Sequence, residues 1–250
     1  MTGSYLICGT PRTGSTLLCA LLDSTGVAGH PESYFRRQGE RSYAEGWGIG
    51  VSPDGAFDYS AYVRAALTAG STANGVFGAR IMWGTMTELA VKLRGVYPDV
   101  GTGDPGLLER AFGTARYIYL WRADVLRQAV SLVRAEQTGF WHDTGEPGQP
   151  EQLAPERKPR YDAAAIREHM REIGQHNAAW RAWFAAAGIR PQPVRYEDLD
   201  ADPAGVTRGI LDYLQLDLPP GRVITARNRR LADDVTQRWA ERYLHESPSH

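Results

Sequence analysis

Short apolar runs alternate along the chain with segments of helical periodicity. Four runs have the length and composition of buried strands: residues 5–8, 76–83, 116–121 and 193–196. The segments around them carry apolar residues at helical spacing, which predicts helices over residues 17–22, 58–69, 85–96, 122–135, 162–187, 204–214 and 236–244. Strands that alternate with helices predict an α/β fold in three layers, with a central parallel sheet flanked by helices.

Two stretches show neither pattern. Residues 39–58 are rich in Gly, Ser, Pro and aromatic residues, and residues 139–159 combine Gly and Pro with mixed charge. We expect surface loops in both places, and the aromatic residues of the first either pack or line a substrate site. No internal repeat or linker interrupts the pattern, so the 250 residues fit a single domain over 1–250.

Composition narrows the classes of protein. The 28 basic and 29 acidic residues leave a formal charge of −1, which argues against a general nucleic-acid binder. Cys8 and Cys19 fall in a predicted strand and helix, so we expect no disulfide framework and a reducing compartment. No charged-then-apolar leader and no apolar run of membrane length occur. These features favour a cytoplasmic protein without membrane insertion.

The turn between the first strand and the first helix is the strongest chemical signal. Its glycine spacing nearly fits the phosphate loop of nucleotide triphosphatases, in which backbone N–H groups and a helix N-terminus hold an anion. Ser15 stands where that pattern needs Lys, and the cation of the turn is Arg12. The turn therefore predicts a P-loop-like phosphate site without the kinase lysine, although a plain strand–helix turn remains the alternative. The candidate ligands are Thr10, Pro11, Arg12, Thr13, Gly14, Ser15 and Thr16.

This turn also resembles the 5′-phosphosulfate loop of sulfotransferases that use 3′-phosphoadenosine 5′-phosphosulfate. Strand residues 117–121 with Arg122 and Ser131 resemble the motif that binds the 3′-phosphate in those enzymes. Further segments resemble the bacterial trehalose 2-sulfotransferase family (26–35, 74–83 and 128–138) or the late strand and acidic turn of the superfamily (194–199). The resemblance implies a sulfotransferase domain that releases adenosine 3′,5′-bisphosphate, uses no metal and has acceptor-side loops at about 30–60 and 139–160.

The resemblance also implies how the reaction proceeds. A hydroxyl of a carbohydrate or glycolipid-precursor acceptor attacks sulfur in line, and Arg12 with the loop N–H groups stabilises the leaving oxygen. Arg80, within an apolar strand, is a candidate second cation, with a surface-facing edge position or a structural ion pair as the alternative. In the family a carboxylate aligns with Ser33 of this chain, so Glu32 is the expected general base. Pairing of Glu32 with Arg36 or Arg37 is the competing interpretation, and His30 is the reserve base.

Other residues carry weaker signals. The aromatic residues Tyr34, Phe35, Trp47 and Trp141 either stack on sugar rings or pack in the core. In the arginine-rich stretch 222–230, Arg227 and Arg229 either contact the 3′-phosphate or belong to a solvated loop. We interpret His169 and His176 as ordinary polar residues, because nothing at metal-ligand spacing completes a site.

Two rival functions and one assembly state stay open. A small-molecule kinase on a P-loop fold would need Mg²⁺ and ATP. A non-catalytic nucleotide-binding protein would bind the nucleotide without turnover. Related bacterial enzymes can dimerise, so a homodimer is a further expectation.

Overall fold

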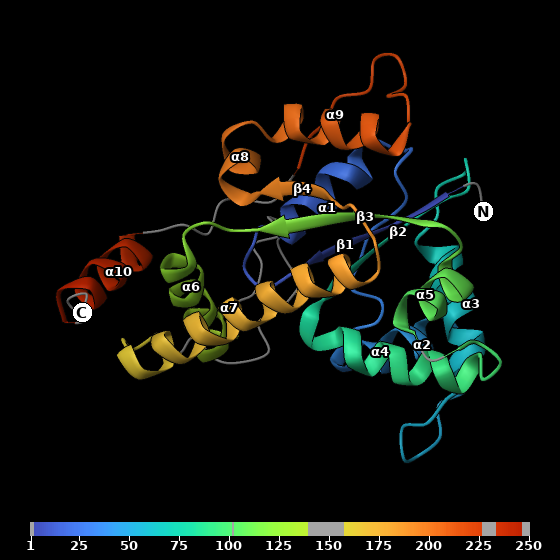
Figure 1. The fold of residues 1–250 in the computed structure, drawn as a ribbon, viewed down its shortest axis with the longest axis horizontal. Coiled ribbons are helices and arrows are strands. Elements are labelled where there is room, and N and C mark those ends of the chain that lie inside the picture. Colours follow the sequence, from blue (N-terminus) through green and yellow to red (C-terminus); the bar gives the residue numbers. More distant parts are fainter. Residues whose placement is uncertain (1–2, 102, 140–157, 227–233, 247–250) are drawn as a thin grey trace.

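The fold was analysed in a computed structural model, which describes residues 3–101, 103–139, 158–226 and 234–246 (Figure 1). All four predicted strands are present and form one parallel sheet in the order β2-β1-β3-β4. Their bounds are β1 (Gly3–Gly9), β2 (Val76–Met82), β3 (Ala115–Trp121) and β4 (Gln192–Arg195). In this register Ile7 of β1 lies between Arg80 of β2 and Ile118 of β3. The carboxyl ends of the strands therefore share one edge of the sheet.

Helices cover both faces of the sheet, as the predicted three-layer arrangement requires. One face carries α1 (Ser15–Ser24), α8 (Tyr196–Ala201) and α9 (Pro203–Leu214). The other carries α2 (Arg37–Gly46), α3 (Tyr59–Ala69), α4 (Trp83–Val96), α5 (Asp104–Phe112) and α7 (Ala163–Ala186). Successive side chains of β1 point to opposite faces of the sheet, so this strand contributes to both cores. Tyr5 and Ile7 pack on the first face, and Leu6 and Cys8 pack on the second.

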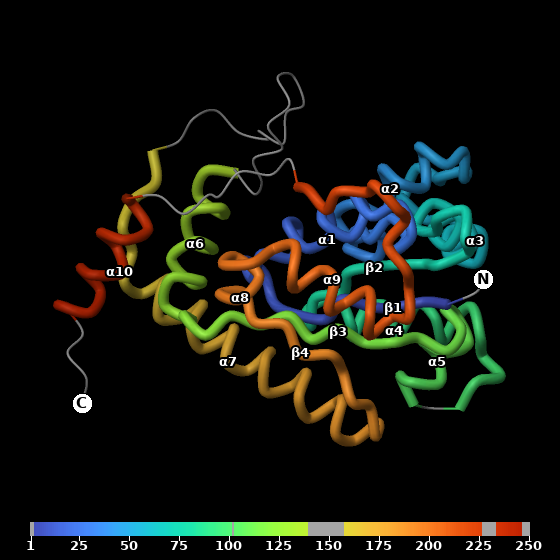
Figure 2. The backbone as a smooth tube through the Cα atoms, turned by 90° about the horizontal axis from the view of Figure 1, so that it is seen from above, coloured from blue at the N-terminus to red at the C-terminus, as the bar shows by residue number. Residues whose placement is uncertain are grey.

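Two helices extend the molecule beyond the carboxyl edge of the sheet. They are α6 (Val125–Thr138), which follows β3, and α10 (Asp234–Glu246), which packs outside α6 (Figures 1 and 2). Asp124 caps α6 by accepting a hydrogen bond from Arg127 N at 2.8 Å, as expected for an acidic residue at a helix start. A third apolar cluster joins α6, α7 and α10 through Val133, Ile166 and Tyr243. These helices form an end wall beside the strand ends.

The prediction of a loop over residues 39–58 is wrong in its first part. Helix α2 runs to Gly46, and only the remainder consists of turns and irregular chain. Its buried Glu40 accepts a hydrogen bond from Tyr59 at 2.9 Å and pairs with Lys92 of α4 at 2.5 Å. Contacts far apart in sequence therefore stabilise a helix whose own sequence is mostly polar.

Other sequence expectations concern short elements, the cysteines and membrane spans. Helix α5 was not predicted, and the acidic turn at 197–199 is part of the short helix α8. The predicted loop 139–159 lies mostly outside the described residues. Both cysteines are buried and unbridged, and burial raises the pKa of the Cys19 thiol to about 12. None of the described helices is long and apolar enough to cross a membrane.

Candidate active site

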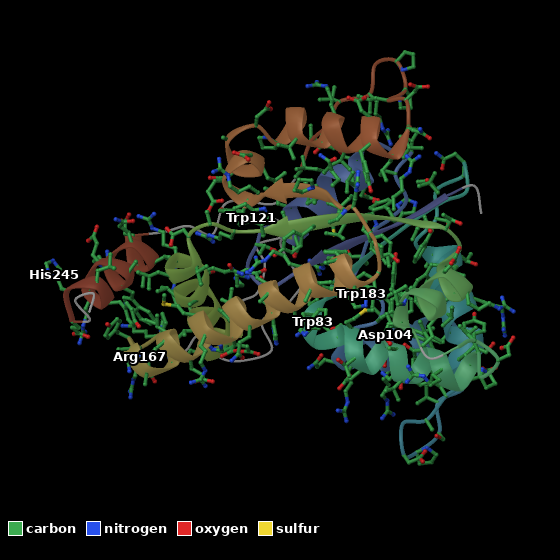
Figure 3. All side chains as sticks on the ribbon, in the orientation of Figure 1. Trp83, Asp104, Trp121, Arg167, Trp183 and His245 are labelled. Carbon is green, nitrogen blue, oxygen red and sulfur yellow. The ribbon has the colours of Figure 1, made fainter. Side chains whose placement is uncertain are left out.

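A cavity of about 880 Å³ opens at the carboxyl edge of the sheet, where parallel α/β folds place their sites. Its walls include the turn after β1, the end of β2 and facing parts of α6 and α7. The segments around residues 33–38, 84–85, 196–204 and 224–226 also contribute. Helix α7 is fastened to this turn, because Trp180 Nε1 donates to Gly9 O at 2.9 Å. Figure 3 labels Trp83 of α4 and Trp183 of α7, which lie where these two helices contact each other. Both rings pack edge-on against the ring of Trp180.

The turn after β1 has the geometry of an anion cradle. Thr10 and Thr13 are fully buried, and Thr13 Oγ1 donates to Thr10 O at 2.9 Å. Gly14 has a left-handed φ of 77°, and a Cβ there would lie 2.7 Å from the ring of Tyr196. Only glycine fits this position. Helix α1 starts at the next residue, so its N-terminal N–H groups lie at the cavity, as the sequence predicts.

Arg12 reaches from this turn to α6. Its φ of 66° is left-handed, which is uncommon for a residue with a side chain, and its Nε donates to Ser131 Oγ at 2.9 Å. Burial, followed by the neighbouring cations Arg122 and Arg134, lowers the pKa of Arg12 to about 10. The guanidinium stays charged at neutral pH, so this arrangement of desolvated cations is suited to an anion.

Arg122 lies beside Arg12, at the end of β3. Its guanidinium lies 4.4 Å from the centre of the Tyr196 ring, and its Nη1 donates weakly to Arg12 O at 3.4 Å. Burial lowers the pKa of Arg122. Its Nε is buried and has no hydrogen-bond partner among the described residues. The orphaned Nε of Arg122, the Arg12 guanidinium and the Ser131 hydroxyl together fit a phosphate group. Its oxygens would accept hydrogen bonds from all three.

Gln128 is a site residue that the sequence reasoning missed. It is fully buried on α6, and its Nε2 donates to Thr10 Oγ1 at 2.9 Å and to Pro11 O at 2.6 Å. The available signal was its position three residues before Ser131, which puts both side chains on neighbouring parts of one helix face. Helix α6 therefore holds the turn at two points, through Gln128 and through Ser131.

Arg80 faces the cavity from the end of β2. Its Nε donates to Ser33 Oγ at 2.7 Å, and its Nη1 donates to Thr16 Oγ1 at 2.8 Å and Ser15 Oγ at 3.2 Å. The structure thus brings Arg80 to the helix end of the anion cradle. These three contacts are with hydroxyl groups at the cavity, and the role of Arg80 as a second cation stays a prediction.

The two candidate bases lie elsewhere. Glu32 is bound through its backbone, because Glu32 O accepts from Arg80 N at 2.9 Å in a bridge to β2. Its side chain is exposed and is not part of the described cavity wall, whereas Ser33 is. Successive residues of an extended segment point to opposite sides, which accounts for the difference. His30 is also off the wall, where its Nδ1 lies 2.5 Å from Asp23 Oδ1.

Three of the four candidate stacking residues, Tyr34, Phe35 and Trp47, belong to the apolar core that α2 and α3 help to form. Tyr34 and Phe35 are 4% and 2% exposed, and Tyr34 OH donates to His30 O at 2.6 Å. Trp47 is half-buried, with its ring stacked 5.1 Å from that of Tyr43. None of the three is among the described residues that line the cavity. Trp141, Arg227 and Arg229 lie outside the described residues.

A second group of polar side chains lines the cavity on the α6–α7 side. It consists of Glu136, Glu172 and His176, and His169 contacts both carboxylates from outside the lining. The sequence predicts that both histidines are ordinary polar residues. Within the described ranges, no group of His, Cys, Asp and Glu is arranged to hold a metal ion.

Comparison with known proteins shows the family of this chain. The family described as Stf0 sulphotransferase matches residues 4–246. The trehalose 2-sulfotransferase of Mycobacterium tuberculosis is 31% identical over 265 residues, covering 98% of this chain and 95% of that protein. The trehalose 2-sulfotransferase of Mycolicibacterium smegmatis is 31% identical over 264 residues, covering 96% and 94%.

Two sulfotransferase domains of known structure resemble the chain in part. A sulfotransferase domain from the curacin biosynthetic pathway has a TM-score of 0.47 at 16% identity, covering 88% of this chain and 76% of that domain. A sulfotransferase domain from the Synechococcus PCC 7002 olefin synthase has a TM-score of 0.41 at 16% identity, covering 99% and 90%. The match over residues 4–246, together with the two relatives at 31% identity, shows that this chain belongs to the Stf0 sulphotransferase family.

Proposed function

We propose that the protein transfers a sulfuryl group from 3′-phosphoadenosine 5′-phosphosulfate to a hydroxyl of a carbohydrate-type acceptor. The observation that carries the proposal is the junction of Arg12, Arg122 and Ser131 beside an anion cradle that lacks the kinase lysine. Two phosphate-type groups on one nucleotide match two adjacent anion sites. The acceptor class rests on the two relatives, whose names state trehalose.

The described residues divide between the two ends of such a donor. Arg122 and Ser131 suit the 3′-phosphate, since one offers an orphaned buried donor and the other a hydroxyl. The N–H groups at the start of α1 suit the 5′-phosphosulfate. Arg12 spans the two places, because it belongs to the turn and contacts Ser131. Its charge would neutralise anions at both.

The chemistry needs positive charge and a base. The acceptor oxygen forms a bond to sulfur, and the bond from sulfur to the 5′-phosphate oxygen breaks with its electron pair on that oxygen. Arg12, Arg80 and the α1 N–H groups would stabilise this charge, so we propose transfer without a metal ion. The acceptor proton passes to a basic group. Glu32 lies off the described wall, whereas His176 lines it and is the better placed candidate.

Calorimetric titration tests the proposal. Adenosine 3′,5′-bisphosphate without magnesium is compared with ATP plus magnesium. Binding of the bisphosphate alone supports the proposal, and transfer is then assayed with radiolabelled donor and trehalose. Binding of ATP alone would favour the kinase, which the absent loop lysine already opposes. Bisphosphate binding without transfer to any acceptor of a broad hydroxyl panel would favour the non-catalytic alternative. A homodimer stays a prediction for sedimentation experiments.

A further inference from the structure

The lining of the cavity contains groups of opposite charge. Arg12, Arg122 and Ser131 form a cationic group. Glu136 of α6 and Glu172 of α7 line the same cavity, and the two helices that carry them pack against each other. Carboxylates repel phosphate and sulfate groups, so these two side chains do not serve the nucleotide. They form a distinct part of the site.

Histidines order these carboxylates. His169 Nε2 lies 2.9 Å from Glu136 Oε2, and His169 Nδ1 lies 3.4 Å from Glu172 Oε2. The side chain of His169 is 15% exposed and does not line the cavity, so it fixes both carboxylates from behind. His176, about two turns beyond His169 on α7, lies 3.9 Å from Glu172 Oε1 and lines the cavity itself. The acidic wall (Glu136, Glu172 and His176) is therefore held by contacts between two helices.

The acidic wall is also fixed relative to the donor site. Trp180 follows His176 by one helical turn and donates to Gly9 O, at the start of the anion cradle. Glu136 follows Ser131 on the same helix. Each half of the wall is thus carried by a helix that also contacts the cradle or the 3′-phosphate site. A ligand bound to the wall would be held in register with the donor.

We propose that the acidic wall is the acceptor subsite and that it selects neutral polyhydroxylated ligands over anionic ones. An ionised carboxylate only accepts hydrogen bonds, and two adjacent hydroxyl groups can donate to its two oxygens. A phosphate or sulfate on the same sugar has no proton to donate at neutral pH and is repelled by both carboxylates. Arg36 and Gln38, which also line the cavity, offer donors for the oxygens of the acceptor.

This inference rests on the proposed function and predicts a measurable preference. Trehalose and trehalose 6-phosphate are compared as acceptors and as ligands of the complex with adenosine 3′,5′-bisphosphate. We expect the wild-type protein to bind and use trehalose at least about 10-fold better, on the scale of one charge-assisted hydrogen bond. A preference for the phosphorylated sugar would overturn the inference.

Variants locate the effect. Glu172→Gln and Glu136→Gln should each raise the KM for trehalose about 10-fold and reduce the preference for trehalose over trehalose 6-phosphate. Binding of adenosine 3′,5′-bisphosphate should stay unchanged. Glu168→Gln is the matched control, because Glu168 lies on α7, pairs with Arg171 and does not line the cavity. Unchanged discrimination in both variants, with transfer intact, would overturn the inference alone. Failure of the proposed function would instead appear as loss of bisphosphate binding in the wild-type protein.

Discussion

Arg12 and Ser131 lie 119 residues apart in the chain, yet Arg12 Nε donates a hydrogen bond to Ser131 Oγ at 2.9 Å. The contact joins the anion cradle to the helix that carries the proposed 3′-phosphate ligand. Bound nucleotide would compete for the same two groups, so donor binding and the position of Arg12 should be coupled. This coupling makes both residues the first targets for mutation.

Removing the Arg12 side chain should affect the transition state most strongly. We expect Arg12→Ala to lower kcat/KM by about 10²–10³-fold or more, the scale found when a charge-stabilising donor is lost. Steady-state kinetics measure this effect. Arg41→Ala is the control, because Arg41 is exposed and pairs with Glu45 on α2. Turnover close to wild type in Arg12→Ala would remove Arg12 from the mechanism.

Ser131→Ala should weaken the binding of one nucleotide and leave the binding of another unchanged. Loss of one hydroxyl contact should weaken adenosine 3′,5′-bisphosphate by about 10-fold. Adenosine 5′-phosphosulfate, which has no 3′-phosphate, should bind as it does to the wild-type protein. Calorimetry with both compounds gives the answer. Equal weakening of both would assign Ser131 to another part of the donor.

Gln128→Leu should uncouple the cradle from α6. The change leaves the buried Thr10 hydroxyl and Pro11 carbonyl without the amide donor, and each such loss costs about 1–3 kcal/mol. We expect lower stability in denaturant and weaker nucleotide binding. Asn177→Leu is the matched control, since this buried amide accepts from Tyr119 OH at 3.1 Å. A similar stability loss with normal nucleotide binding in both variants would contradict a positioning role for Gln128.

Glu32→Gln tests the base that the sequence favours. Because the carboxylate lies off the described wall, we expect kcat to change by less than about 10-fold, below the usual contribution of a general base. The measurement is kcat under saturating donor, with His30→Ala in parallel. A loss of about 10²–10⁴-fold in Glu32→Gln alone would restore Glu32 as the base.

The sequence predicts the strands and the anion cradle well because both depend on neighbouring residues. The runs at β1 to β4 and the spacing of Gly9 and Gly14 contain most of the needed information. Helix α2 escaped prediction because its burial depends on Glu40, Lys92 and Tyr59, which come from three separate helices.

The same limit applies to the site. The family motif implies that Arg122 and Ser131 bind the 3′-phosphate. In the structure both contact Arg12, and their role in binding phosphate stays a prediction. The Gln128 contacts and the acidic wall depend on how α6 packs against the turn and α7, which periodicity does not specify. The exclusion of Tyr34 and Phe35 from the cavity wall likewise depends on which layer buries them.

Helix α6 would fix the distance between the donor and the acceptor in the proposed reaction. It contacts the cradle through Gln128 and Ser131, and in the proposals above Ser131 would bind the donor and Glu136 the acceptor. From Ser131 to Glu136 the helix advances by about 7.5 Å, at 1.5 Å per residue. Because a helix is stiff along its axis, the number of residues between Ser131 and Glu136 would set the spacing between the two bound substrates. A new acceptor specificity could therefore evolve by substitution of side chains near Glu136, while the distance along α6 from Ser131 stays the same.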